Sequence, residues 1–150
     1  MTQEEKQLLL IDLCARLPHK VKIKCDGYPY GITVTGVVGD QIFHTPYFIG
    51  GEIIINKHTI DTVRPYLRPM SSMMQGEWEE MTALIYPYGR VNRNPDNKNE
   101  LLLWLSAEEN EMPIILMNNV FSWLNKNMFD YRGLIPMGLA LEASEGIYNI

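Results

Sequence analysis

Residues 20–25 read Lys-Val-Lys-Ile-Lys-Cys, a strict alternation of charged and apolar side chains. Successive side chains of a β-strand point to opposite faces, so this alternation predicts a strand with Val21, Ile23 and Cys25 inward and a row of lysines outward. The next segment, Tyr28 to Val38, is rich in β-branched and aromatic residues and predicts a second strand.

Turn signals predict how these strands pair. Gly39-Asp40 favours a two-residue hairpin because glycine adopts positive φ at little cost, so residues 41–45 are expected to pair back on the second strand. Gly50-Gly51 predicts another turn, into a strand at Glu52–Asn56 whose continuous apolar run indicates cover on both faces. Residues 20–62 are therefore expected to form a small curled antiparallel sheet, for which an SH3-like arrangement is a candidate.

A helix is predicted before this sheet. Thr2 and Glu5 have the spacing of a capping box, in which each side chain accepts a hydrogen bond from the other residue's backbone N–H. Pro18 is expected to end the helix. The apolar stripe at helical spacing comprises Leu10, Leu13, Cys14 and Leu17.

The second half of the chain is predicted to be mainly helical. Pro65 and Pro69 argue against a regular element across residues 64–73, and Ser72 with Gln75 has the spacing of a helix cap. The apolar face of that helix is expected to comprise Met74, Trp78, Met81 and Ile85. A last helix, beginning at Pro113, is expected to bury Met117, Val120, Phe121, Leu124 and Met128.

These elements predict an α+β fold in a single domain over residues 1–150. Residues 1–62 form its helix and β-sheet part, and residues 63–150 its mainly helical part, with a loop at 86–100 that is dense in turn formers. A chain of 150 residues with 46% hydrophobic composition is long enough to bury a core without staples.

Composition narrows the classes of function. The net charge is −5, and residues 76–150 carry five Lys/Arg against eleven Asp/Glu, which argues against bulk binding of duplex nucleic acid but leaves room for a local basic site. No run of eighteen apolar residues and no signal peptide is present, so we expect a cytoplasmic protein. Cys14 and Cys25 stand apart from each other and are expected to be small buried hydrophobic residues.

Catalytic patterns are missing from the sequence. His19, His44 and His58 could transfer protons near neutral pH, but they lack the close pairing of zinc ligands. No serine stands in a G-x-S-x-G elbow, and the glycines form neither a P-loop nor a dinucleotide fingerprint. The sequence therefore favours a non-enzymatic protein without a cofactor or metal, and structural or surface roles for the histidines.

Two groups of basic residues could bind an anion. The lysines at 20, 22 and 24 lie roughly 6 to 7 Å apart along a strand and present their charges in a row. Lysines on an edge strand also deter aggregation without any ligand, and the sequence alone favours this interpretation. Arg90 and Arg93 stand in the predicted loop near Tyr86 and Tyr88, where guanidinium groups suit phosphate and flat rings suit a base.

Two further segments carry a resemblance. The first is Arg64-Pro65-Tyr66-Leu67-Arg68-Pro69-Met70-Ser71-Ser72-Met73, and the second, residues 123–143, includes Phe-Asp-Tyr-Arg-Gly-Leu-Ile and Gly-Leu-Ala-Leu-Glu-Ala. Both resemble segments of a family of small proteins encoded by phages and prophages of gut Bacteroidales, for which no activity is known. The resemblance implies a role in the encounter between a phage and its bacterial host.

The second segment contains an aromatic and charged cluster. Asp130 can orient Arg132 by a charge-assisted hydrogen bond, beside Trp123 and Tyr131, as in a binding site. The alternative is a purely structural role, a latch in which Asp130 and Arg132 tie the helix end to the first segment. The sequence favours this alternative.

The function expected from these observations is counter-defence, in the cytoplasm of the host bacterium. An oligomeric, non-enzymatic phage protein would bind and sequester a nucleotide-like immune signal. The expected ligand contacts are Tyr66, Arg68, Arg90, Arg93, Trp123, Tyr131 and Arg132. One alternative is an inhibitor that binds a host protein through the acidic C-terminal half and the methionines. Another is a metal-independent nucleotide hydrolase or phosphodiesterase built on His19, His44 or His58.

Overall fold

The computed structural model describes residues 1–25, 28–45, 47–49, 52–54, 57–84 and 114–148. The chain divides into two compact units, of which the first comprises Met1–Leu67 with Arg132–Ile150 and the second comprises Arg68–Tyr131. The α+β class is confirmed. The single domain over residues 1–150, with parts at 1–62 and 63–150, stays a prediction.

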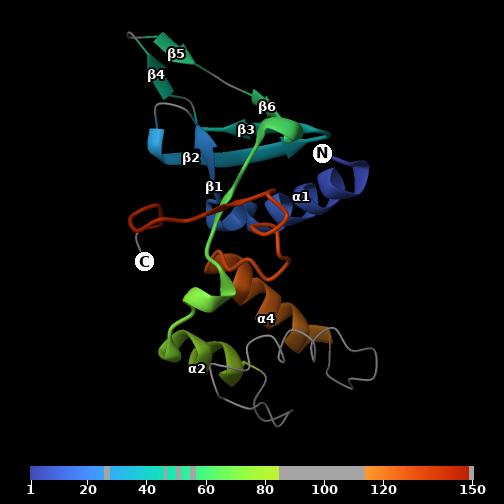
Figure 1. The fold of residues 1–150 in the computed structure, drawn as a ribbon, viewed down its shortest axis with the longest axis vertical. Helices are drawn as coiled ribbons and strands as arrows, with labels where there is room; N and C mark the ends of the chain where they lie inside the picture. Colours follow the sequence, from blue (N-terminus) through green and yellow to red (C-terminus); the bar gives the residue numbers. More distant parts are fainter. Residues whose placement is uncertain (26–27, 46, 50–51, 55–56, 85–113, 149–150) are drawn as a thin grey trace. The chain divides into compact units, whose positions relative to one another are not determined.

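The first unit contains an N-terminal helix and a curled antiparallel sheet, as predicted (Figure 1). Its elements are α1 (Gln3–Arg16), η1 (Leu17–His19), β1 (Lys22–Cys25), β2 (Tyr28–Val38), β3 (Gln41–His44), β4 (Tyr47–Ile49), β5 (Glu52–Ile54), β6 (Lys57–Thr59), η2 (Ile60–Thr62), β7 (Tyr66–Leu67) and β8 (Leu141–Glu142). The main sheet has the strand order β1-β2-β3-β6, β4 pairs with β5, and β7 pairs in parallel with β8.

The predicted hairpin joins β2 to β3. Val38 pairs with Gln41, and Gly39 between them has φ +60°. Irregularities in register, one between Ile23 and Cys25 on β1 and one between Val34 and Gly36 on β2, interrupt the ladders. Such bulges bend strands, which accounts for the curl of the sheet. The SH3-like detail stays a prediction.

Strand β1 is the last strand of the four-stranded sheet, but its outer edge is not open. Its outer side is covered by the chain returning from η2, because Ile23 forms an antiparallel bridge with Pro65 and the Lys24 N–H donates to the Arg64 carbonyl at 2.9 Å. Residues 63–67 are alternately buried and half-buried, with Val63, Pro65 and Leu67 inside. The expectation that Pro65 and Pro69 prevent a regular element is therefore wrong, since the two-residue strand β7 lies between them.

Helix α1 begins with the predicted capping box. The Glu5 N–H donates to Thr2 Oγ1 at 3.1 Å, and the Thr2 N–H donates to Glu5 Oε2 at 2.6 Å. Its buried face differs from the predicted stripe and comprises Leu9, Asp12, Leu13 and Arg16. Cys14 is exposed, which corrects its expected burial, and nothing is described of the Cys25 side chain. The prediction failed because it placed only apolar residues inside, whereas Asp12 and Arg16 are buried as an ion pair.

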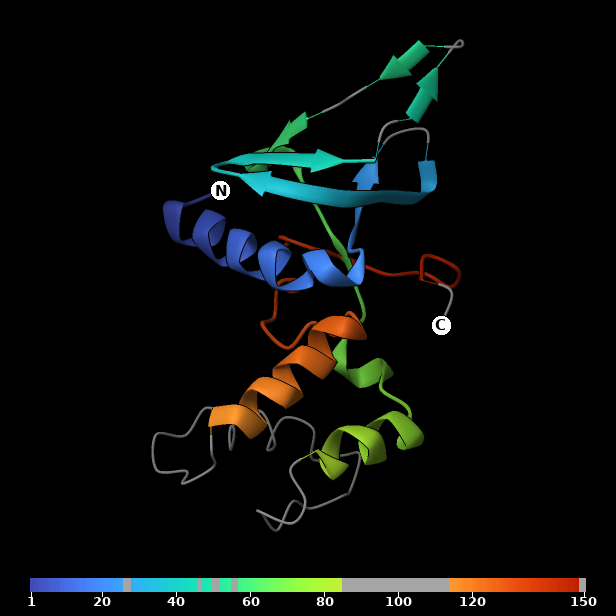
Figure 2. The ribbon, with the colours of Figure 1, turned by 180° about the vertical axis from the view of Figure 1, so that it is seen from behind.

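The second unit contains the short turn η3 (Met70–Ser72) and the helices α2 (Gln75–Ala83) and α4 (Ile114–Lys126). The two helices pack beside each other, as Figure 2 shows. Its core contains Met73, Trp78, Met81, Val120, Leu124 and Phe129. The predicted α4 stripe is confirmed for Met117, Val120, Phe121 and Leu124, which are buried in the core or pack against it. Met128 is also buried but lies beyond the end of the helix, with φ +60°.

The cap of α2 differs from the prediction. Met74, not Ser72, is the residue before the helix, and the Met74 N–H donates to Glu77 Oε2 at 2.9 Å. The Ser72 hydroxyl instead donates to the Pro69 carbonyl at 2.8 Å within η3. Met74 is consequently 65% exposed, while Trp78 and Met81 are buried as expected. Ile85, the loop at 86–100 and Pro113 lie outside the described residues.

Gly31 holds β2 close to its neighbours. It has φ +67°, and a Cβ there would lie 2.8 Å from the Ile23 carbonyl oxygen and 2.9 Å from Cε2 of Tyr66. Both contacts are closer than real Cβ atoms allow, so the position requires glycine.

We predict that Gly31→Ala lowers the free energy of unfolding by about 2 kcal/mol or more, through backbone strain and the clash with Tyr66. Gly36→Ala is the matched control in the same strand, because a Cβ at Gly36 meets only Phe43 Cβ at an ordinary 3.9 Å. Urea denaturation of both variants measures the difference. Equal stabilities would show that Gly31 is not constrained by these contacts.

Candidate functional site

The predicted contact residues are distributed over both units. Tyr66 and Arg132 belong to the first unit, whereas Arg68, Trp123 and Tyr131 belong to the second. Arg90 and Arg93 lie outside the described residues.

In the second unit, the Arg68 guanidinium is engaged in contacts within the chain. Its guanidinium donates to both carboxylate oxygens of Glu77, at 2.8 and 3.0 Å, and lies 4.3 Å from the centroid of the Phe129 ring. The side chains of Arg68 and Glu77 are only 15% and 14% exposed. A phosphate would have to displace a two-pronged ion pair to reach this guanidinium, so the geometry is that of a structural contact.

Arg68 also joins the two segments that carry the family resemblance. Its N–H donates to the Met128 carbonyl at 2.8 Å, and its carbonyl accepts the Asp130 N–H at 2.8 Å. This pairing around Phe129 ties the end of α4 to the first segment through the backbone. It is the connection that the latch interpretation requires, made by main-chain atoms.

Trp123 and Tyr131 complete the aromatic side of this unit. The Trp123 ring stacks on Phe129 at 5.7 Å, and its indole N–H donates to Glu80 at 3.2 Å. The Tyr131 ring lies 5.3 Å from that of Phe121. Both rings pack against the core, which is the common role of large aromatic residues beside a helix pair.

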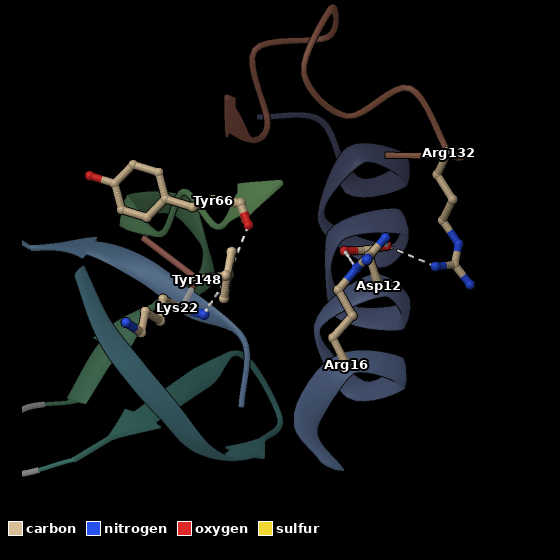
Figure 3. A network of polar contacts seen from close by, with 6 residues as sticks. All are labelled: Asp12, Arg16, Lys22, Tyr66, Arg132 and Tyr148. Atoms are coloured by element: carbon tan, nitrogen blue, oxygen red, sulfur yellow. Dashed lines mark hydrogen bonds and ion pairs between the residues drawn. The ribbon is translucent and has the colours of Figure 1, made fainter. Parts of the chain in front are cut away.

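In the first unit, Arg132 binds a buried carboxylate (Figure 3). Its Nη1 donates to Asp12 Oδ1 at 2.8 Å, and Arg16 donates to both oxygens of the same carboxylate at 2.8 and 2.9 Å. Asp12 and Arg16 are fully buried. The ion pair between Arg132 and Asp12 connects the segment that begins at residue 132 to α1. The Arg132 guanidinium, which was predicted to contact a ligand, is therefore bound to a carboxylate of the chain itself.

A second polar network surrounds Tyr148. Its hydroxyl accepts the Lys22 N–H and donates to the Tyr66 carbonyl, each at 2.9 Å. These two backbone groups would face each other if the pairing of Ile23 with Pro65 continued, so the hydroxyl is inserted into the ladder. Burial is the main cause that raises the pKa of Tyr148 to about 12, against the opposing effect of the Lys22 N–H.

Three cationic side chains and one aromatic ring lie on one face of the first unit. Because Ile23 and Pro65 are paired and point inward, Lys22 lies opposite Tyr66 and Lys24 lies opposite Arg64 on the outer side. We call these four residues the β1 face. The Tyr66 ring reaches across β1 to Gly31 on β2, and Figure 3 shows this ring and the Lys22 ammonium directed away from α1.

The cations of the β1 face are not neutralised within the described part of the chain. Lys24 is exposed, Arg64 donates only to the carbonyls of Asp61 and Val63, and Lys22 donates to the Ile147 carbonyl at 2.6 Å. Ion pairs within the described residues involve other cations, among them Lys6, Arg16, Arg68 and Arg132. Of the described arginines in the predicted set, Arg68 and Arg132 are thus paired with carboxylates, whereas within these residues Lys22, Lys24 and Arg64 are not.

This face contains only one residue of the predicted set, Tyr66. The alternation of lysines at 20, 22 and 24 indicated this face. Their interpretation as protection of an edge strand assumes an open edge, whereas the outer edge of β1 is bridged by Pro65. Arg64 was missed because its place opposite Lys24 follows from a long-range register that no local pattern reveals.

Two of the three histidines, His44 and His58, form a pair on the inner side of the sheet. The rings of His44 on β3 and His58 on β6 stack at 5.1 Å, and the His44 Nδ1 lies 2.8 Å from the Thr45 carbonyl. Burial, and secondly His44, lower the pKa of His58. Within the part of the chain that the structure describes, no group of three or more His, Cys, Asp or Glu side chains could hold a metal ion.

Among the described helices, none combines the length and the apolar character needed to cross a membrane. No protein-family model, no curated protein and no solved structure matches the chain.

We predict that Asp12→Ala lowers the free energy of unfolding by about 3 to 5 kcal/mol, because it leaves a buried guanidinium without its carboxylate. Asp61→Ala is the control, since it removes a partner of the more exposed Lys6–Asp61 pair and is expected to cost less than about 1 kcal/mol. Urea denaturation measures both. Similar losses in the two variants would contradict a structural role for the buried pair.

Tyr148 should make stability depend on alkaline pH. Its pKa of about 12 in the folded protein lies above the value near 10 of an unfolded tyrosine, so the stabilisation is complete below pH 10 and is lost as pH rises toward 12. Tyr148→Phe should remove this decline and cost about 1 to 3 kcal/mol at neutral pH, because the Lys22 N–H and the Tyr66 carbonyl lose their partner. Tyr30→Phe, at a residue that is 64% exposed, should retain the decline in urea denaturation.

Proposed function

We propose that the protein is a non-enzymatic binding protein for nucleotide-like anions, with its contact surface on the β1 face. The observation that carries this proposal is the set of cations on β1 and the returning segment, which have no carboxylate partner within the described residues and do not lie on an open sheet edge. Aggregation control explains lysines on an exposed edge, and that explanation does not apply here.

The chemistry of the face suits a nucleotide. Lys22, Lys24 and Arg64 offer positive charge to phosphate, and the half-buried Tyr66 ring offers a flat surface to a base. The family resemblance places such a protein in the encounter of a phage with its host. Sequestration of a nucleotide-like immune signal, as counter-defence in the host cytoplasm, is the role that we propose for this binding.

Inhibition of a host protein is the second candidate, and the charge of the second unit favours it. Residues 68–131 carry five Lys/Arg against nine Asp/Glu. Glu79 and Glu80 on α2 are exposed, and so is Met74, the residue before this helix. A basic protein partner would be attracted to this surface, and the complex would weaken with salt.

The test is thermal unfolding of the purified protein with mononucleotides, cyclic dinucleotides, cyclic trinucleotides and NAD-derived cyclic nucleotides. A ligand present at a hundred times its dissociation constant stabilises the fold by about 2.7 kcal/mol, which raises the melting temperature by roughly 5 to 10 °C. We expect such a rise for at least one nucleotide, and its loss in Lys24→Glu. Lys57→Glu, on β6 of the same unit, is the matched control and should keep the rise.

Mass spectrometry of the recovered ligand separates the alternatives. Intact nucleotide supports sequestration, whereas cleaved nucleotide would identify a hydrolase and direct attention to His44 and His58. A rise in melting temperature that is equal in Lys24→Glu would remove the β1 face from the proposal. An unchanged melting temperature with every nucleotide would contradict nucleotide binding and favour a protein partner.

A further inference from the structure

We infer that the β1 face binds a linear single strand of nucleic acid, with successive phosphates on its cations and bases on Tyr66 and on the neighbouring Tyr30. This inference rests on the proposed function and narrows it to one ligand class. It follows from the arrangement of the charges in a row and from a second aromatic ring near them.

The cations lie along a line and not around a pocket. Lys22 and Lys24 are alternate residues of one strand, so their side chains leave the backbone roughly 6 to 7 Å apart. Arg64 lies across from Lys24 on the next segment. This spacing is close to that between successive phosphates of an extended single strand. A compact cyclic nucleotide cannot place its phosphates on all of these groups.

A second tyrosine lies next to this row. Tyr30 directly precedes Gly31, the residue that the Tyr66 ring contacts, and its side chain is 64% exposed. A Cβ at Gly146 would lie 3.8 Å from Tyr30 Cε1, and the following residue, Ile147, accepts the hydrogen bond from Lys22. Tyr30 and Lys22 therefore border the same short segment. Two rings beside a basic row give the alternation of stacking and charge found in surfaces for single strands.

Lys22 can contribute although it is already engaged. Its ammonium donates to the Ile147 carbonyl and lies 5.9 Å from the centroid of the Tyr148 ring. An ammonium has three protons, so a phosphate can accept a further one without breaking the first contact. The Ile147 carbonyl holds the side chain in place, which lowers the entropy lost on binding.

A duplex fits this face less well. A duplex carries about twice the charge per length of one strand and needs a wide basic surface, whereas the chain has a net charge of −5. The bases of a duplex are also stacked on each other and cannot reach Tyr30 or Tyr66. The preference for a single strand thus follows from both the charge and the rings.

Fluorescence anisotropy with labelled oligo-dT and oligo-rU of two to twelve nucleotides tests the inference. Affinity should rise with length and then level off once the row is filled, and cyclic dinucleotides should compete weakly. Contact with three phosphates gives a slope of log K against log[salt] of about −2, so affinity should fall about 20-fold between about 50 and 200 mM salt. Comparison of the two oligomers shows whether the 2′-hydroxyl matters.

Three variants locate the binding. Lys24→Ala should reduce the salt slope by about 0.7, and Tyr30→Ala should weaken binding about tenfold at every salt concentration, because a stacking ring is lost. Lys57→Ala is the matched control and should change neither value. Circular dichroism of each variant confirms that the fold is retained, which is expected because Lys24, Tyr30 and Lys57 are exposed.

The outcomes distinguish this inference from the proposed function. Tight binding of a cyclic dinucleotide that Lys24→Ala abolishes, without length-dependent binding of oligomers, would overturn the inference and keep the proposed function. Absence of binding by both ligand classes would overturn both. Oligomer binding that is unchanged in Lys24→Ala and Tyr30→Ala would place the ligand elsewhere and also overturn the inference.

Discussion

The return of residues 63–67 to the outer side of β1 is the constraint on which the first unit depends. One antiparallel bridge, between Ile23 and Pro65, places alternate residues of both segments inside and outside. The inner residues close the core over β1, and the outer ones assemble the β1 face. The same register leaves a gap in the ladder beyond Lys22, which the Tyr148 hydroxyl fills. A shift by one residue would turn every one of these side chains to the opposite face.

Buried charge explains which cations remain available to a ligand. Asp12 is fully buried and accepts hydrogen bonds from Arg16 and Arg132, so one carboxylate engages two guanidinium groups. Glu77 accepts two hydrogen bonds from the Arg68 guanidinium while it caps α2. A cation with an internal carboxylate and little exposure gains less from phosphate than one whose only partners are water and carbonyl groups. Free charge is therefore a better guide to a binding surface than the arginine count of a segment.

Much of the fold could be predicted from local patterns, whereas the site could not. The capping box at Thr2, the hairpin at Gly39 and the α4 stripe follow from spacing within a few residues, and all three are present. The buried face of α1 was misjudged because the burial of Asp12 depends on Arg132, which is 120 residues away. Likewise, the β1 face depends on a register between residues 22–24 and 64–66. Interactions between distant segments leave no periodicity in the sequence, so pattern analysis cannot reach them.

A basic face on an acidic chain has a physical consequence for the choice of ligand. At physiological ionic strength the Debye length is about 8 Å, so the phosphates on Lys22 and Lys24 respond mainly to these neighbours and little to the net charge of −5. Over that distance the negative net charge of the chain does not prevent a short anion from binding to unpaired lysines. The short ligand that we infer for the β1 face is thus compatible with an acidic chain, because the attraction that it requires is local.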